Sequence, residues 1–271
     1  MNDKTETGTF WDHLDELRYV LLRIFLVTIL CGIVAFIFKD FLFDVVLAPK
    51  NDDFITYKWL DKIGGIFSGI PTGEFGVSLI NTELAQQFIV HIKTALCFGF
   101  LCASPYILYQ FFRFVSPALY ENERQYAIQL VGSGYIMFMV GVLIGYLLIF
   151  PLTFRFLGTY QVSSEVTNLI SLDSYMSTLF LICIAIGIVF ELPVVSWLFA
   201  KMGWLNSPFM KKYRKHAIVA ILVVAAIITP TSDVFTLLAV SLPMYLLYEG
   251  SIILVGITER KRKKQSELII A

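Results

Sequence analysis

A few charged side chains are candidates for chemistry because they lie in an otherwise apolar sequence. Glu191 sits deep in the run ICIAIGIVFELPVVSWLF, where an unpaired carboxylate is costly and must take a proton or find a hydrogen-bond donor. Pro193 has no backbone N–H and leaves a carbonyl free one turn earlier. The pair predicts a polar pocket in a helix wall. Two interpretations are open: a protonated Glu191 that bonds the freed backbone as a structural lock, or a functional polar contact.

A second acidic group lies in the segment 101–124, LCASPYILYQFFRFVSPALYENER, which joins two very apolar runs. Ser116 is suited to cap a short polar helix, and Pro117 fits the first position of that helix, where no N–H is needed. The predicted helix carries Glu123 beside Arg124. A structured, charged cap between two membrane helices is unusual for a simple connection, and it indicates a binding surface.

Residues 10–18, FWDHLDELR, predict an amphipathic helix before the first apolar run. Its apolar positions recur at helical spacing, and its acidic residues face the other way; the apolar set is Phe10, Leu14 and Leu17, and the acidic set is Asp12, Asp15 and Glu16. One interpretation is a helix that only lies in the membrane interface. The other is a receptor that binds a peptide on the face formed by this helix and the acidic cap.

Enzyme chemistry is not indicated. The three histidines form no HExxH pair, and the sequence has no Gly-x-Ser-x-Gly elbow, phosphate-binding loop or dinucleotide fingerprint. The four cysteines lie inside apolar runs without metal-ligand spacing. We therefore expect a protein that is not an enzyme and that has no cofactor, no metal site and no nucleic-acid partner.

The elements that position these residues follow from composition. Hydrophobic residues make up 57% of the 271 residues and charged residues only 15%, with a mean hydropathy of +0.74. A soluble domain of this length could not bury so many apolar side chains. Apolar runs of about 20 residues match a hydrocarbon core of about 30 Å. The sequence predicts an all-α integral membrane protein without a cleaved signal peptide.

Six spans are expected in one membrane domain over 1–271, and they fall at about 19–38, 85–112, 126–150, 172–200, 216–229 and 234–257. Residues 39–84 are expected to form an extended external loop with an insertion near 50–80. The apolar part of the fifth span, 217–228, gives only about 18 Å of helix. The sixth is interrupted by Pro243 and Glu249. We therefore expect short fifth and sixth helices.

Basic residues predict the orientation. Six spans put both termini on one side, where fourteen Lys and Arg residues fall, against five on the other. The excess includes RKRKK at 260–264. Because cytoplasmic segments are enriched in Lys and Arg, both termini and the acidic cap are expected in the cytoplasm.

The segment SPYILYQFFRFVSPALYENER resembles the first cytoplasmic loop of the twin-arginine translocase C subunit family, TatC. Three further stretches match the family pattern in order: FWDHLDELR at 10–18, FELPV at 190–194, and ITPTSDVF with LPMYLLYE within 228–249. The resemblance implies a subunit that binds signal peptides bearing two arginines and exports folded proteins across the bacterial inner membrane, driven by the proton-motive force. It also implies docking of single-span TatA/TatB-type subunits and self-association in a larger complex.

The resemblance also implies roles for individual residues. Glu16 and Glu123 match the family's two signal-peptide-binding glutamates, and a carboxylate suits the planar fork of a guanidinium. The positions that match the motifs around them are Arg18, Phe114, Pro117 and Tyr120, with Pro105, Tyr109 and Gln110 earlier in the loop. Pro49 and Asp233 match external residues of the family. Glu191 and Pro193 match its intramembrane segment, which favours a polar contact with a partner helix or cargo during transport.

The last pair of helices departs from the family pattern. A polar residue, commonly Gln, often follows Asp-Val-Phe, whereas this chain has Thr236 or Leu237 there. Thr229 and Thr236 are therefore the weaker candidates for partner docking. The rival hypothesis is a secondary transporter with a polar pathway through Glu191, Lys93 and Glu249. The absence of a visible internal repeat and the scarcity of polar residues in the spans weigh against it.

Overall fold

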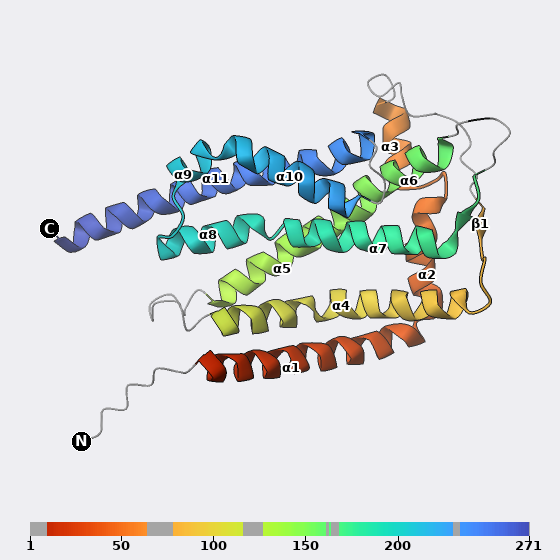
Figure 1. Ribbon diagram of the computed structural model, residues 1–271, viewed down its shortest axis with the longest axis horizontal. Coiled ribbons are helices and arrows are strands. Elements are labelled where there is room, and N and C mark those ends of the chain that lie inside the picture. Colours follow the sequence, from red (N-terminus) through yellow and green to blue (C-terminus); the bar gives the residue numbers. More distant parts are fainter. Residues whose placement is uncertain are drawn as a thin grey trace. The chain divides into compact units, whose positions relative to one another are not determined.

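The computed structural model describes residues 10–63, 78–115, 127–160, 163, 168–229 and 234–270. These residues are almost entirely helical (Figure 1). Five helices or helix pairs among them are long and apolar enough to cross a membrane: Leu14–Ile37, Gln86–Phe114, Leu130–Thr159, Leu172–Met202 and Thr236–Arg262. The predicted all-α membrane fold is confirmed.

The chain divides into two compact units. The described parts of 1–42 and 91–135 form the first, and those of 43–90 and 136–271 form the second. Because each unit has its own internal packing, each is described separately.

In the first unit, α1 (Phe10–Ile37) packs on α4 (Gln86–Val115). A Cβ at Gly99 would lie only 2.6 Å from the backbone nitrogen of Gly32, so the two helix backbones are in direct contact. Small residues permit this approach in membrane helices. The predicted amphipathic segment 10–18 is the first part of α1 and is continuous with the span.

His91 of α4 contacts α1 rather than a polar pathway. Its Nε2 lies 3.2 Å from the carbonyl oxygen of Phe36, and its ring stacks on the Phe36 ring with centroids 3.9 Å apart. Both contacts join α4 to α1 within the first unit.

The segment that we expected to be a long external loop contains helices. The second unit begins within α2 (Lys39–Leu47) and continues with the 3₁₀ turn η1 (Ala48–Lys50) and α3 (Ile55–Ile63). Strand β1 (Leu79–Ile80) pairs in parallel with β2 (Ile170–Ser171), with Leu79 opposite Ile170. The part of the predicted insertion at 64–77 lies outside the described residues.

The third span is longer than the sequence indicated. Helix α5 (Ala127–Ile144) continues through a π turn, η4 (Gly145–Ile149), into α6 (Phe150–Thr159). Pro151 does not end the span because it occupies the first turn of α6, where its missing N–H is tolerated.

The fourth span is α7 (Leu172–Val189) followed by α8 (Leu192–Met202). The Ser171 side chain caps α7 by accepting a hydrogen bond from the backbone N–H of Ser174 at 3.2 Å. A Cβ at Gly141 of α5 would lie 2.8 Å from the Cα of Gly187, so α5 and α7 also pack backbone to backbone. Gly203, with φ 84°, ends α8 in the left-handed conformation.

The last helices correct one expectation. Helix α9 (Ser207–Lys212) leads to α10 (Arg214–Ile228), whose 15 residues give about 22 Å, so the fifth span is short as predicted. The sixth is not short: α11 (Val234–Ile270) runs for 37 residues with Pro243 inside it. Neighbouring helices make a proline tolerable in a membrane helix, and the Lys and Arg residues of the tail are good helix formers.

Candidate functional site

A groove between α1 and α4 in the first unit holds the largest gathering of predicted site residues. Its volume is about 410 Å³, and its walls are Asp15, Glu16, Tyr19, Val20 and Arg23 from α1 and Gln110, Arg113 and Phe114 from α4. The spacings of three, four and seven residues put each set on one helix face. The structure therefore brings Glu16 and Phe114 into one cavity.

The groove is polar at one end because Asp15 and Glu16 lie side by side on exposed turns of α1. Arg23 is on the same face about two turns deeper, and Arg113 lines the opposite wall. The acidic end can thus accept a cation, while the positive charge of Arg23 opposes deeper entry of a second cation.

Gln110 adds an acceptor to the groove. Its side chain is only 3% exposed, and its Nε2 donates to the Tyr106 hydroxyl at 2.5 Å. Its Oε1 is buried and has no hydrogen-bond partner among the described residues. A buried acceptor left unpaired costs about 1–3 kcal/mol, so Gln110 is positioned to accept an N–H from a ligand.

The remaining predicted residues of this surface lie elsewhere. Arg18 is exposed on α1 and does not line the groove. Pro117, Tyr120 and Glu123 lie outside the described residues, as does the 116–124 part of the predicted cap.

Glu191 lies at a break between two helices. Helix α7 ends at Val189 and α8 begins at Leu192, with Pro193 in the first turn of α8. Both carboxyl oxygens of Glu191 are buried and have no hydrogen-bond partner among the described residues. The bond to the freed backbone that defines the structural lock is therefore absent there, and the carboxyl group is left for another partner.

Pro49 belongs to a network of tyrosine–carbonyl bonds at one end of the second unit. The Tyr57 hydroxyl lies 3.0 Å from the carbonyl oxygen of Pro49 and 3.2 Å from that of Pro151. Tyr175 donates to the carbonyl of Val46 at 2.9 Å. These bonds hold α2 and η1 against α6 and α7.

The same network includes a buried cation. The Arg155 guanidinium lies 5.0 Å from the centre of the Tyr57 ring, a cation–π distance. Burial raises the pKa of the Tyr57 phenol well above its ordinary value, and the charge of Arg155 opposes that rise. The phenol therefore stays protonated and keeps donating at any physiological pH.

The weaker docking candidates, Thr229 and Thr236, are both buried. Thr229 donates to the carbonyl of Ala225 at 3.0 Å, and Asp233 lies outside the described residues. Glu249, part of the rival pathway, is instead paired with Arg214 at 2.6 Å and accepts from Tyr245 at 3.1 Å.

Comparison with known proteins identifies the family. The family described as Sec-independent protein translocase protein (TatC) matches residues 12–243. The chain belongs to the TatC family. The TatC protein of Blattabacterium sp. subsp. Periplaneta americana is 33% identical over 96% of this chain and 99% of its own length. The TatC protein of Aquifex aeolicus is 34% identical over 93% of this chain and 97% of its length.

Solved structures agree with this assignment. A crystal structure of the twin-arginine translocase receptor TatC superposes with a TM-score of 0.71 at 33% identity, covering 91% of this chain and 99% of that one. Family membership confirms the resemblance inferred from the motifs. As a TatC-family member the chain is a membrane component of a protein translocase rather than an enzyme, and the small-solute transporter hypothesis is not supported.

Two features of the TatC-family site were not predicted from the sequence. Gln110 was matched to the loop motif without a role, and its burial with one unpaired oxygen became visible only in the fold. No role was predicted for Arg23, which lines the groove in the structure. The one sequence feature that could have placed Arg23 on the same helix face as Glu16 is their spacing of seven residues.

Proposed function

We propose that this TatC-family chain is the core subunit of the twin-arginine translocase that binds the signal peptide of folded cargo. The observation that carries the proposal is the groove in which Glu16 lies with Asp15, Gln110 and Phe114. It combines carboxylates for a guanidinium, a buried acceptor for an N–H and an aromatic wall for apolar side chains.

The two arginines of a signal peptide take separate acidic partners in this proposal. Glu16 binds one guanidinium in the groove, and Glu123 binds the other from the segment that follows α4. Gln110 accepts a hydrogen bond from the peptide, Phe114 packs on its apolar residues, and Arg18, Pro117 and Tyr120 shape the surrounding surface. The charge of Arg23 limits how far the peptide's arginines enter the groove.

Photo-cross-linking tests the location. A photoreactive residue at Tyr19, in the groove, should capture a purified twin-arginine signal peptide. A matched residue at Leu26, which is exposed two turns further along α1, should not. Capture at Leu26 and not at Tyr19 would contradict the assignment.

The proposed setting is the bacterial inner membrane with both termini in the cytoplasm, supported by the fourteen-to-five distribution of basic residues. Single cysteines at Asn51 and Gln265 in a cysteine-free background should react with an impermeant reagent from opposite sides. Labelling of both from one side would overturn this orientation.

The proposed docking edge for single-span TatA/TatB-type subunits is the outer face of α10 and α11. Val219 on α10 is 61% exposed and Leu242 on α11 is 65% exposed. Helix α10 is also shorter than the hydrocarbon thickness of the bilayer, a mismatch that favours association with another helix. Thr229 and Thr236 are buried behind this edge and stabilise its helices. Cysteines at Val219 or Leu242 should cross-link to a partner helix. Cross-links confined to α1 or α5 would place the edge elsewhere.

Glu191 and Pro193 complete the proposal as an intramembrane polar contact for a partner helix or cargo. The support is the buried carboxyl group without a hydrogen-bond partner among the described residues. Pro49, whose carbonyl accepts from Tyr57, and Asp233 are both assigned to the external side.

A further inference from the structure

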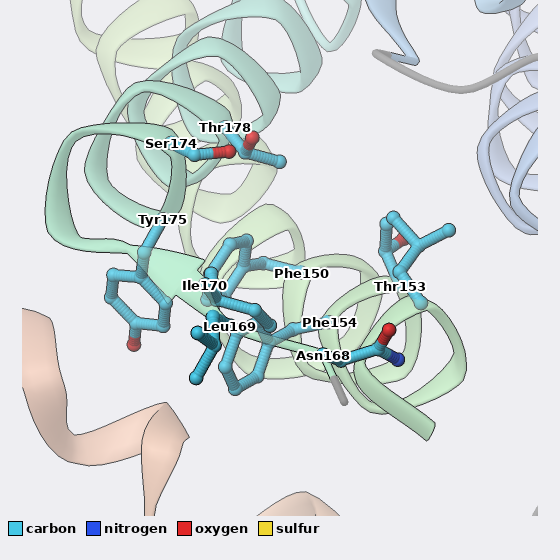
Figure 2. A pocket seen from close by; sticks show the side chains of 10 residues that line it. Phe150, Thr153, Phe154, Asn168, Leu169, Ile170, Ser174, Tyr175 and Thr178 are labelled. Atoms are coloured by element: carbon cyan, nitrogen blue, oxygen red, sulfur yellow. The ribbon is translucent and has the colours of Figure 1, made fainter. Parts of the chain in front are cut away.

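A cavity of about 300 Å³ in the second unit has no role in the proposed signal-peptide site. It lies between α6, the start of α7 and the segment that enters β2 (Figure 2). Its floor is aromatic: Phe150 and Phe154 are stacked with centroids 5.7 Å apart, and Tyr175 meets both rings edge-on. Its polar lining includes Thr153, Asn168, Ser174 and Thr178, and none of the described residues that line it is charged.

Thr153 indicates that the cavity accepts a hydrogen-bonding ligand. The residue is 1% exposed, and its hydroxyl has no partner among the described residues. Threonines in helices commonly bond to the carbonyl four residues earlier, as Thr159 does on the same helix, at 2.7 Å from the Arg155 carbonyl. Thr153 therefore contributes to the cavity lining a buried hydroxyl without a hydrogen-bond partner among the described residues.

The other polar groups are arranged around the same space. Figure 2 shows Ser174 and Thr178 together on α7 and Asn168 beside Thr153. The Asn168 amide nitrogen is already used, because it donates to the carbonyls of Gly158 and Tyr160 at 3.1 and 2.8 Å. The three hydroxyls are thus the donors available to a ligand, and an uncharged acceptor such as a carbonyl suits them.

The position of the cavity points to a membrane lipid. It lies where the span Leu130–Thr159 ends and the span Leu172–Met202 begins, which is the depth of the polar–apolar boundary of a bilayer. Leu181 and Ile188 follow Ser174 by seven and fourteen residues on the same face of α7, and both are exposed. The cavity is therefore continuous with an apolar strip that faces the acyl chains.

We propose that this cavity binds the glycerol-ester region of a diacyl phospholipid. The hydroxyls of Thr153, Ser174 and Thr178 donate to ester carbonyls, the aromatic floor contacts the first carbons of one chain, and the rest of that chain lies along Leu181 and Ile188. A volume of 300 Å³ equals about ten water molecules, enough for this region and too small for a whole lipid. Because the described lining residues are uncharged, we expect binding to be independent of headgroup charge.

The test compares an ester lipid with its ether analogue. Purified full-length protein in detergent is titrated with dioleoyl phosphatidylcholine and with the dialkyl ether of the same headgroup and chains, and thermal stabilisation is followed. The wild type should need about fivefold less ester than ether lipid for half-maximal stabilisation, since the ether lacks the carbonyl acceptors. Dioleoyl phosphatidylglycerol should act like the phosphatidylcholine.

Variants distinguish lipid binding in the cavity from general stabilisation of the protein by lipid. Thr153→Val should abolish the ester preference, while Thr159→Val, whose hydroxyl bonds its own helix outside the cavity, should keep it. Ser174→Trp, which fills the cavity from its exposed rim, should abolish the preference even if Thr153→Val does not fold. Equal responses to ester and ether lipid in the wild type would overturn the proposal. So would an ester preference that survives Ser174→Trp, or stabilisation by the anionic lipid alone.

Discussion

Replacing Glu191 with leucine should stabilise the folded protein while impairing transport. Both carboxyl oxygens are buried without a hydrogen-bond partner among the described residues, and such a group costs about 1–3 kcal/mol in the folded state. Leucine removes that cost at similar volume. For a protein of this size, about 1 kcal/mol shifts the unfolding midpoint by about 2–4 °C, so Glu191→Leu should unfold a few degrees higher than the wild type.

The measurement uses the protein's own thiols. Cys97 and Cys183 are buried, so a thiol-reactive fluorophore reports unfolding of the purified protein during heating. Glu249→Leu is the matched control, because Glu249 lies in a span but is paired with Arg214. Removing this carboxylate breaks a partly exposed ion pair and leaves the Tyr245 hydroxyl without its acceptor, so this variant should unfold at a lower temperature.

Transport assays complete the test of Glu191. Glu191→Leu and Glu191→Ala should bind signal peptide normally but transport poorly, whereas Glu191→Gln should keep much of the activity because an amide still forms hydrogen bonds. The reasoning would be refuted if Glu191→Leu were destabilised as strongly as Glu249→Leu, or if it transported like the wild type. Loss of signal-peptide binding in a folded Glu191→Ala variant would instead assign the residue to recognition.

Two further predictions concern packing. Tyr57→Phe should lower the free energy of unfolding by about 1–3 kcal/mol, because it leaves the carbonyls of Pro49 and Pro151 without their donor. Tyr160→Phe, at an exposed tyrosine, should change the thermal unfolding midpoint little. Equal shifts of the midpoint in the two variants would argue against the tyrosine network. Gly99→Ala should cost about 1–3 kcal/mol, because its Cβ meets the α1 backbone. Gly132→Ala, where a Cβ meets nothing within 4 Å, should leave the thermal unfolding midpoint unchanged or raise it slightly. An unchanged midpoint in Gly99→Ala would contradict the close contact between α1 and α4.

Membrane class and family were predictable because they depend on local signals. Apolar length predicts a span irrespective of its neighbours, and the 101–124 motif is contiguous in sequence. The length of α11 was not predictable from the same signals, because Pro243 ends a helix in isolation but is tolerated where neighbouring helices support the backbone. Similarly, the segment 39–63 has no apolar run long enough to span a membrane, yet it folds into helices held by long-range tyrosine bonds.

The candidate site was predictable in part. Glu16 and Phe114 were assigned to one surface through the family motif, and the structure places both in one groove. The role of Gln110 depends on which of its amide atoms already has a hydrogen-bond partner, and no sequence pattern encodes that. Thr236 was a docking candidate because of its place after Asp-Val-Phe in the family pattern, and its burial inside the chain could not be predicted from that match. Side-chain direction on α11 is decided by packing against neighbouring helices rather than by local sequence.

The most direct test of the account is the affinity of the purified protein for a twin-arginine signal peptide. Glu16→Lys removes a charge-assisted contact worth about 1.5–3 kcal/mol, so the dissociation constant should rise about ten- to a hundredfold. Glu123→Lys should have a similar effect, and a twin-lysine peptide should bind the wild type weakly because an ammonium lacks the planar fork. Asp53→Lys, at an exposed position that is paired with Lys58 and lies outside the groove, should bind like the wild type. Unchanged affinity in both the Glu16 and Glu123 variants would contradict the proposed receptor site.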